Sequence, residues 1–149
     1  MMISGTIDSI LKSKVSQLWS VSPETTVFDA ITLMAEKNIG SLLVTADDKL
    51  IGIVSERDYT RKVALKGKSS KTIAVREIVS TPVVTVGPGH TVEECLRLMT
   101  DRRVRHLPVL EGDKILGVVS IGDLVNWVIS AQNVALEQME NYIAGNYYS

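Results

Sequence analysis

The sequence contains a single cysteine, Cys95, and only two histidines, His90 and His106. An internal disulfide needs two cysteines, so the chain forms none. Structural zinc sites use four Cys or His ligands, and three such residues in the whole chain disfavour one. The shortage of cysteine fits a reducing compartment.

Long apolar runs are also missing. No segment approaches the roughly 20 apolar residues that span a bilayer, and residues 1–14 show no apolar core followed by a small-residue cleavage site. We therefore expect a cytoplasmic protein with no membrane contact. The formal net charge is −1 and the pI is about 6.1, so the chain has no overall attraction for nucleic acid.

The residues needed for catalysis are scarce as well. His106 has no Ser or Cys partner in the pattern of a nucleophilic pair, and no pair of acids points to general acid–base chemistry. We predict that the chain is not an enzyme and holds no metal. With 45% hydrophobic and 22% charged residues, it has the composition of an ordinary globular protein.

An internal repeat organises the chain. A shift of 65 residues aligns Val21–Asp58 with Val86–Asp123 without a gap, and 14 of the 38 pairs are identical. Each copy opens with a capping-box pattern, Thr26–Asp29 and Thr91–Glu94, followed by apolar residues at helical spacing. Cys95 lies on this apolar face in place of Ala30, which favours a buried small residue over a reactive thiol.

Two apolar runs separated by a turn follow each predicted helix and indicate a hairpin. They are Ser41–Thr45 with Leu50–Val54, and His106–Leu110 with Ile115–Val119. A short strand is expected ahead of each helix, over Leu18–Val21 and Val83–Val86, and a second helix starts at Ser55 and at Ser120. The fold class is therefore α+β, with two β-α-β-β-α units. One unit of about 60 residues buries little surface, so we expect the two to pack through their sheets.

The expected boundaries are residues 10–66 for the first repeat, 67–71 for a linker, 72–130 for the second repeat and 131–149 for a C-terminal helical extension. The helical pattern runs from Leu124 to Ala144 and meets a candidate C-cap at Gly145. Its apolar side either packs within the chain or forms a dimer interface.

Both repeats end in Gly-apolar-apolar-Ser-x-x-Asp, at Gly52–Asp58 and Gly117–Asp123. Glycine permits close approach to a strand, the serine stands at a helix start that favours anions, and the aspartate offers acceptors to a ribose diol. Ser-x-x-Asp is also a plain capping box. Its recurrence at the same offset favours a nucleoside-phosphate site over a cap alone.

The repeat resembles the cystathionine-β-synthase (CBS) motif, and the pair resembles the two-repeat module of that family over residues 10–130. The resemblance implies pseudo-two-fold symmetry and two clefts for AMP, ADP, ATP, NAD or S-adenosylmethionine. It implies that one cleft uses Ser55, Arg57 and Asp58 with Val84, Val104 and Arg105. It implies that the other uses Val118, Ser120 and Asp123 with Trp19, Ile39 and Gly40. Arg57 has Gly122 as its counterpart, so the two clefts should differ.

The function expected from this resemblance is an adenine-nucleotide-binding regulatory module that senses energy or redox state and acts on a partner protein. AMP is the first candidate ligand and NAD a close alternative. The competing hypothesis is a ligand-free module for dimerisation and protein interaction. A homodimer is expected in either case, because two-fold dimers are the commonest assembly.

Overall fold

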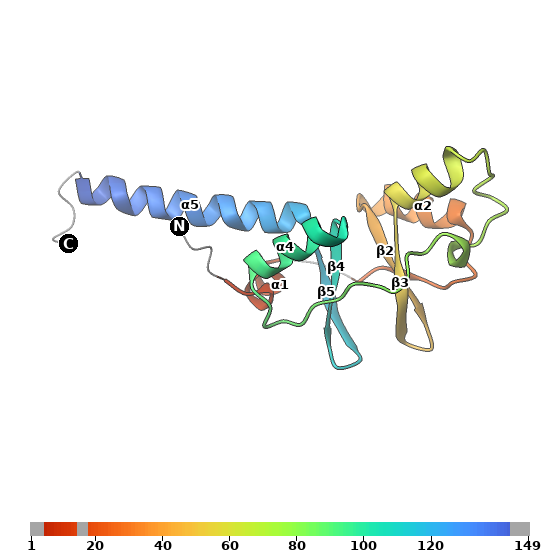
Figure 1. Ribbon diagram of the computed structural model, residues 1–149, viewed down its shortest axis with the longest axis horizontal. Coiled ribbons are helices and arrows are strands. Elements are labelled where there is room, and N and C mark those ends of the chain that lie inside the picture. Colours follow the sequence, from red (N-terminus) through yellow and green to blue (C-terminus); the bar gives the residue numbers. More distant parts are fainter. Residues whose placement is uncertain (1–4, 15–17, 144–149) are drawn as a thin grey trace. The chain divides into compact units, whose positions relative to one another are not determined.

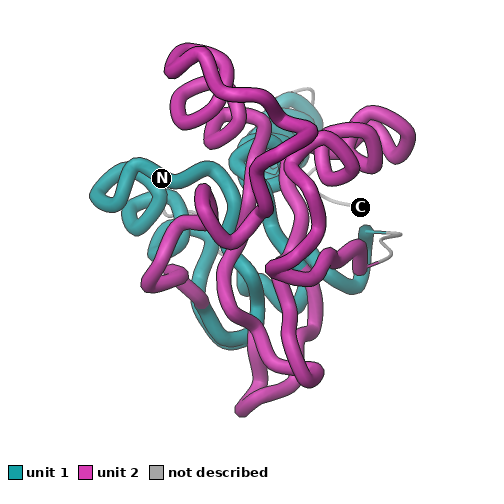
Figure 2. Tube along the Cα trace, turned by 90° about the vertical axis from the view of Figure 1, so that its right-hand side faces the viewer, with its two compact units in different colours: residues 1–15, 86–109, 118–149 teal, residues 16–85, 110–117 magenta. Residues whose placement is uncertain are grey.

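The computed structural model describes residues 5–14 and 18–143 (Figure 1). The chain divides into two compact units (Figure 2). Unit 1 comprises residues 1–15, 86–109 and 118–149, and unit 2 comprises residues 16–85 and 110–117.

Unit 2 carries the first repeat around a three-stranded sheet of order β1-β2-β3. The strand β1 pairs parallel to β2, and β2 pairs antiparallel to β3. Its elements are β1 (Ser20–Val21), α2 (Val27–Lys37), β2 (Ser41–Ala46), β3 (Lys49–Ser55), α3 (Glu56–Tyr59), the π-helical turn η1 (Thr60–Ala64) and the 3-10 helix η2 (Val75–Glu77).

The core of unit 2 follows the apolar periodicity of the sequence. The helix α2 buries Val27, Ala30 and Met34, which recur at helical spacing. They pack in one cluster with side chains from β2, β3 and the segment around η2, namely Leu42, Val44, Val54, Val63, Ile73, Val75 and Ile78. The predicted helix and hairpin of the first repeat are confirmed.

Unit 1 carries the helices of the second repeat. Its elements are α1 (Ile7–Ser13), α4 (Val92–Arg102) and α5 (Ile121–Ile143). The strands β4 (His106–Glu111) and β5 (Lys114–Ser120) form a two-stranded sheet, of which residues 106–109 and 118–120 belong to unit 1 and residues 110–117 to unit 2. A complete capping box at Thr91 and Glu94 starts α4. The helix then buries Val92, Cys95 and Met99, as the repeat predicts.

The strand expected ahead of the second repeat's helix is nearly lost. Over the predicted range Val83–Val86, only Val86 forms a bridge, to Val109 of β4. In the first repeat, the Leu43 N–H donates to the Trp19 carbonyl at 3.2 Å. Pro108 stands at the position equivalent to Leu43 and has no N–H, so the second repeat lacks this ladder bond.

The helix α5 runs without a break from Ile121 to Ile143 and is the longest helix in Figure 1. Much of its apolar surface is exposed: Val125, Ile129, Val134, Leu136 and Met139 are 44–61% exposed. The candidate C-cap Gly145 lies outside the described residues. Of the helices within residues 5–14 and 18–143, none is long and apolar enough to cross a membrane.

The helix α1 was not predicted from the sequence. It buries Ile7 and Ile10 in unit 1, and its backbone is tied to the turn before α4. The Ile7 N–H donates to the His90 carbonyl at 2.9 Å, and the Asp8 N–H donates to the Pro88 carbonyl at 3.0 Å. This helix places Lys14 close to the second repeat's Ser-x-x-Asp string.

Candidate functional site

The string of the first repeat starts α3 through a complete capping box. The Asp58 N–H donates to Ser55 Oγ at 3.2 Å, and the Ser55 N–H donates to Asp58 Oδ2 at 2.9 Å. The Ser55 hydroxyl also donates to Asp58 Oδ2, at 3.1 Å. The capping function that the sequence allowed for Ser55 and Asp58 is therefore present in the structure.

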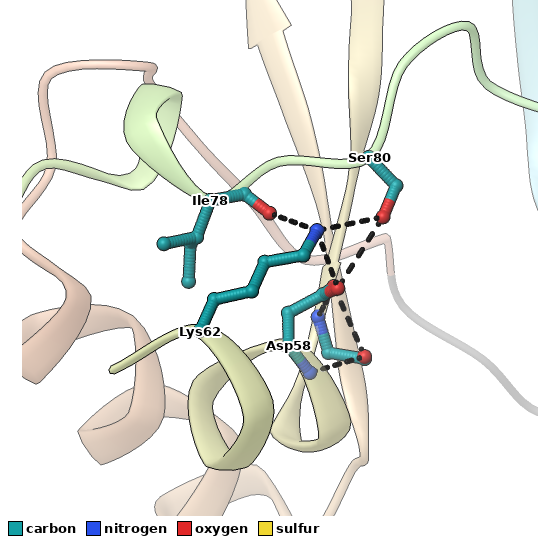
Figure 3. Close-up of polar contacts among 5 residues, drawn as sticks. Asp58, Lys62, Ile78 and Ser80 are labelled. Carbon is teal, nitrogen blue, oxygen red and sulfur yellow. Dashed lines mark hydrogen bonds and ion pairs between the residues drawn. The ribbon is translucent and has the colours of Figure 1, made fainter. Parts of the chain in front are cut away.

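The second oxygen of Asp58 is held by two further residues (Figure 3). Lys62 Nζ lies 3.1 Å from Asp58 Oδ1, and the Ser80 hydroxyl donates to the same oxygen at 3.3 Å. Lys62 is fixed in turn, because its ammonium donates to the Ile78 carbonyl at 2.9 Å. We call Ser55, Asp58, Lys62 and Ser80 the Asp58 cluster.

Gly52 allows a close approach, but the approaching group belongs to the chain itself. A Cβ added at Gly52 would lie 2.5 Å from Val79 Cγ2 and 3.0 Å from the Ser80 carbonyl oxygen. The segment is held against β3 by a bridge in which the Ser80 N–H donates to the Ile53 carbonyl at 3.4 Å. The glycine of the first string thus makes room for the segment that carries Ser80.

The string of the second repeat forms the equivalent cap at the start of α5. The Asp123 N–H donates to Ser120 Oγ at 3.1 Å, and the Ser120 N–H donates to Asp123 Oδ2 at 2.8 Å. Lys14 Nζ lies 2.7 Å from the same oxygen and also donates to the Val118 carbonyl at 2.9 Å. We call Lys14, Ser120 and Asp123 the Asp123 cluster.

Burial, together with the charges and hydrogen bonds of the Asp123 cluster, shifts the pKa values of Asp123 and His106. Burial alone would raise the pKa of Asp123, but hydrogen bonds from Lys14 and Ser120 outweigh it and hold the pKa below its ordinary value. Burial, assisted by the Lys14 and Arg105 charges and opposed by Asp123, lowers the pKa of His106. The His106 imidazole is therefore harder to protonate in the folded protein than in the unfolded chain.

Equivalent backbone bonds place one predicted residue beside each string. The Glu56 N–H donates to the Gly40 carbonyl at 3.1 Å in unit 2, and the Ile121 N–H donates to the Arg105 carbonyl at 2.8 Å in unit 1. Gly40 also lines an open pocket of about 490 Å³ with residues of α2 and α3, namely Ile31, Met34, Ala35, Asn38, Ile39, Glu56, Tyr59 and Thr60.

The other predicted site residues fall on both units. Unit 2 contains Trp19, Arg57 and Val84, and unit 1 contains Val104 and Val118. The Arg57 side chain is exposed on α3, and the Trp19 ring carries Lys37 Nζ 4.4 Å from its centroid. Within each unit the structure joins the serine and aspartate of one string; the grouping of all twelve residues into two nucleotide sites stays a prediction.

Three residues of the two clusters were missed by the sequence reasoning. Lys62 lies four residues after Asp58, a spacing typical of ion pairs on one helical face, so this contact had a local signal. Ser80 and Lys14 lie 22 and 109 residues from the aspartates they contact. Only the folded chain brings these two residues to their partners.

Each repeat has a helix, a hairpin and one Ser-x-x-Asp cap that starts the next helix, so the chain is a tandem pair of equivalent units. Comparison with known proteins identifies the family. The CBS domain model matches residues 11–65 and 75–130. The chain belongs to the CBS-domain family and carries two CBS domains. CBS-domain pairs are regulatory modules that often bind adenosine-containing ligands.

Individual relatives agree with this assignment. The CBS domain-containing protein CBSX3, mitochondrial, of Arabidopsis thaliana is 38% identical over 97% of this chain and 74% of its own length. A solved CBS-domain protein from Burkholderia ambifaria is 50% identical, has a TM-score of 0.83, and is matched over 86% of this chain and 96% of its own.

A more distant structure shares the fold. The CBS domain pair of protein MJ0100, solved in complex with 5′-methylthioadenosine and S-adenosyl-L-methionine, has a TM-score of 0.75 at 18% identity. The match covers 86% of this chain and 98% of that one.

Proposed function

We propose that the chain is an adenine-nucleotide-binding regulatory module that acts on a partner protein. The observation that carries the proposal is the doubled Ser-x-x-Asp string in two CBS domains, with each serine and aspartate joined at a helix start. The adenosine ligands of the MJ0100 domain pair support the same ligand class. AMP is the first candidate ligand and NAD the close alternative.

Each aspartate is proposed to accept from ribose hydroxyls, with the serines and Arg57 near the phosphate. A hydrogen bond to a charged acceptor contributes about 1.5–3 kcal/mol, so Asp58→Ala and Asp123→Ala should each weaken one site about ten- to a hundredfold. Isothermal titration of each variant with AMP measures this. Variants that lose stability but keep wild-type affinity would leave capping as the sole function of the two aspartates.

The competing function is a ligand-free dimerisation and interaction module, and a thermal melt separates the two. A ligand that binds only the folded state adds about 2.7 kcal/mol at one hundred times its dissociation constant. Each kcal/mol raises the melting temperature of a domain of this size by about 2–4 °C. We therefore expect a rise of several degrees with AMP or NAD, and a much smaller rise with GMP or GTP.

The protein must first be stripped of any co-purified nucleotide by unfolding and refolding, because loaded protein would show no shift. If stripped protein shows no shift with AMP, ADP, ATP, NAD or S-adenosylmethionine at millimolar concentration, the ligand-free module replaces the nucleotide-binding one.

A homodimer is part of the proposal. The exposed apolar side chains of α5 support it, since a helix side of this composition is stabilised by a partner. The cytoplasm stays the predicted compartment; the name of the Arabidopsis relative places that protein in mitochondria.

A further inference from the structure

The two aspartates differ in how many donors the protein's own chain supplies to them. The two oxygens of a carboxylate offer about four lone-pair sites. Asp58 accepts from the Ser55 N–H and the Ser55 hydroxyl on Oδ2, and from Ser80 and Lys62 on Oδ1. Its acceptor capacity is fully used inside unit 2.

Asp123 is engaged differently. Within residues 5–14 and 18–143, its donors are the Ser120 N–H and the Lys14 ammonium, and both contact Oδ2. Each serine Oγ accepts from the N–H of its aspartate. Each serine hydroxyl also acts on that carboxylate: the Ser55 hydroxyl donates to Asp58, and a side-chain hydrogen bond from Ser120 helps to lower the pKa of Asp123. Within the described residues, the hydrogen bonds and the ion pair of Asp58 therefore occupy both carboxylate oxygens, whereas the contacts of Asp123 with the Ser120 N–H and Lys14 occupy Oδ2.

The residues that occupy Asp58 are themselves held in place. Ser80 is positioned by the bridge to Ile53 and by the close packing of its segment on Gly52. The Lys62 ammonium contacts three acceptors, namely the Ile78 carbonyl at 2.9 Å, the Asp58 carboxylate at 3.1 Å and Ser80 Oγ at 3.4 Å. A ribose hydroxyl that approaches Asp58 must displace at least one of these donors.

The space beside the two serines also differs. Among the residues that the structure describes, a Cβ added at Gly122 would meet Ser120 Oγ alone, at 3.6 Å. The equivalent position in the first repeat is Arg57. An approaching ligand thus meets less of the chain's own side-chain volume next to Ser120 than next to Ser55.

We propose that Lys62 and Ser80 act as built-in competitors for the ligand at Asp58, so that nucleotide fills the Asp123 cluster first and the Asp58 cluster more weakly. The inference rests on the proposed function and adds an order of binding to it. It makes Lys62 and Ser80 specificity-determining residues, although neither belongs to the Ser-x-x-Asp string.

The test is isothermal titration of stripped full-length chain with AMP and, separately, with NAD. We expect a tighter first step that Asp123→Asn weakens about ten- to a hundredfold, and a weaker second step that Asp58→Asn removes. Removing one competing neutral donor, in Ser80→Ala, should strengthen the second step about two- to tenfold. Lys62→Met should strengthen it further, and the double variant Lys62→Met/Ser80→Ala should bring the two steps close together.

The matched control is Lys68→Met/Ser69→Ala, which makes the same two changes at exposed linker positions and should keep the wild-type order. A urea melt of each variant verifies folding, and Ser80→Ala alone tests the proposal if the double variant does not fold. Two equal steps in the wild type, or a first step lost in Asp58→Asn, would overturn the order of binding while the proposed function stands. Binding of neither nucleotide to any variant would overturn both.

Discussion

Gly52 offers a direct test of the packing that positions Ser80. In Gly52→Ala the new methyl group would lie 2.5 Å from Val79 Cγ2, closer than the 3.0 Å that real Cβ contacts respect, and 3.0 Å from the backbone oxygen of Ser80. Val79 can rotate, but the Ser80 carbonyl moves only if the bridge to Ile53 is strained. Overpacking of this kind costs about 1–3 kcal/mol. The melting temperature should therefore fall by about 2–12 °C.

The control is the same chemical change at Gly122, in the first turn of α5. There the one contact of the added Cβ within the described part of the chain is Ser120 Oγ at 3.6 Å, and alanine is favoured over glycine within a helix by up to about 1 kcal/mol. Gly122→Ala should be as stable as the wild type or more so. Both variants are measured in urea and thermal melts of nucleotide-stripped protein. Equal stability of Gly52→Ala and the wild type would refute the argument that the Val79–Thr81 segment is packed firmly on β3.

Three further predictions follow from buried groups and from α5. Burial, assisted by Glu94, raises the pKa of the Cys95 thiol to about 11, so native protein at pH 8 should react with iodoacetamide at least about tenfold more slowly than urea-unfolded protein; equal rates would contradict burial. His106 has a lowered pKa, so the unfolded chain binds its proton first and the free energy of unfolding should fall as the pH drops below about 6.5. In His106→Gln this fall in the free energy of unfolding should vanish. If urea melts of the variant show the same pH dependence as those of the wild type, His106 is not its cause. Leu136→Lys/Met139→Lys should convert a wild-type dimer to a 16.3 kDa monomer in sedimentation, with little loss of stability because both positions are exposed; a monomeric wild type at micromolar concentration would disprove the dimer.

The fold was largely predictable because its main signals are local. Helical periodicity and the turn between apolar runs place α2, α4 and both hairpins, and the 65-residue repeat checks each assignment against its copy. The same comparison wrongly predicted a strand over Val83–Val86. The two copies share the apolar pattern, but Pro108 lacks the backbone N–H that Leu43 donates in the first copy. The helix α1 lies outside the aligned region and so had no copy to support it.

The part of the candidate site that was predictable is the Ser-x-x-Asp string of each repeat. Ser55 with Asp58, and Ser120 with Asp123, are brought together by four residues of backbone and needed no tertiary contact to be inferred. The residues that distinguish the two clusters come from elsewhere in the chain. Ser80 approaches through the bridge to β3, and Lys14 through α1. Neither contact has a periodicity or a spacing that a single sequence displays.

This division bears on what the doubled string means. In both copies the cap uses the same atoms, with the serine N–H on Oδ2 of the aspartate at 2.9 and 2.8 Å. Recurrence of the string is therefore explained by two caps as well as by two ligand sites, and the string alone does not separate these functions. Of the two carboxylate oxygens, the cap uses only Oδ2, which accepts from the serine N–H. Capping therefore does not determine which other side chains donate to the carboxylate. In the first repeat Ser80 and Lys62 contact Oδ1 of Asp58, whereas in the second repeat Lys14 contacts Oδ2 of Asp123. This asymmetry does not affect capping, but it does affect the affinity of each aspartate for a ligand. Two binding steps of unequal affinity would therefore show that the aspartates contact a ligand. Stability measurements alone would not show this.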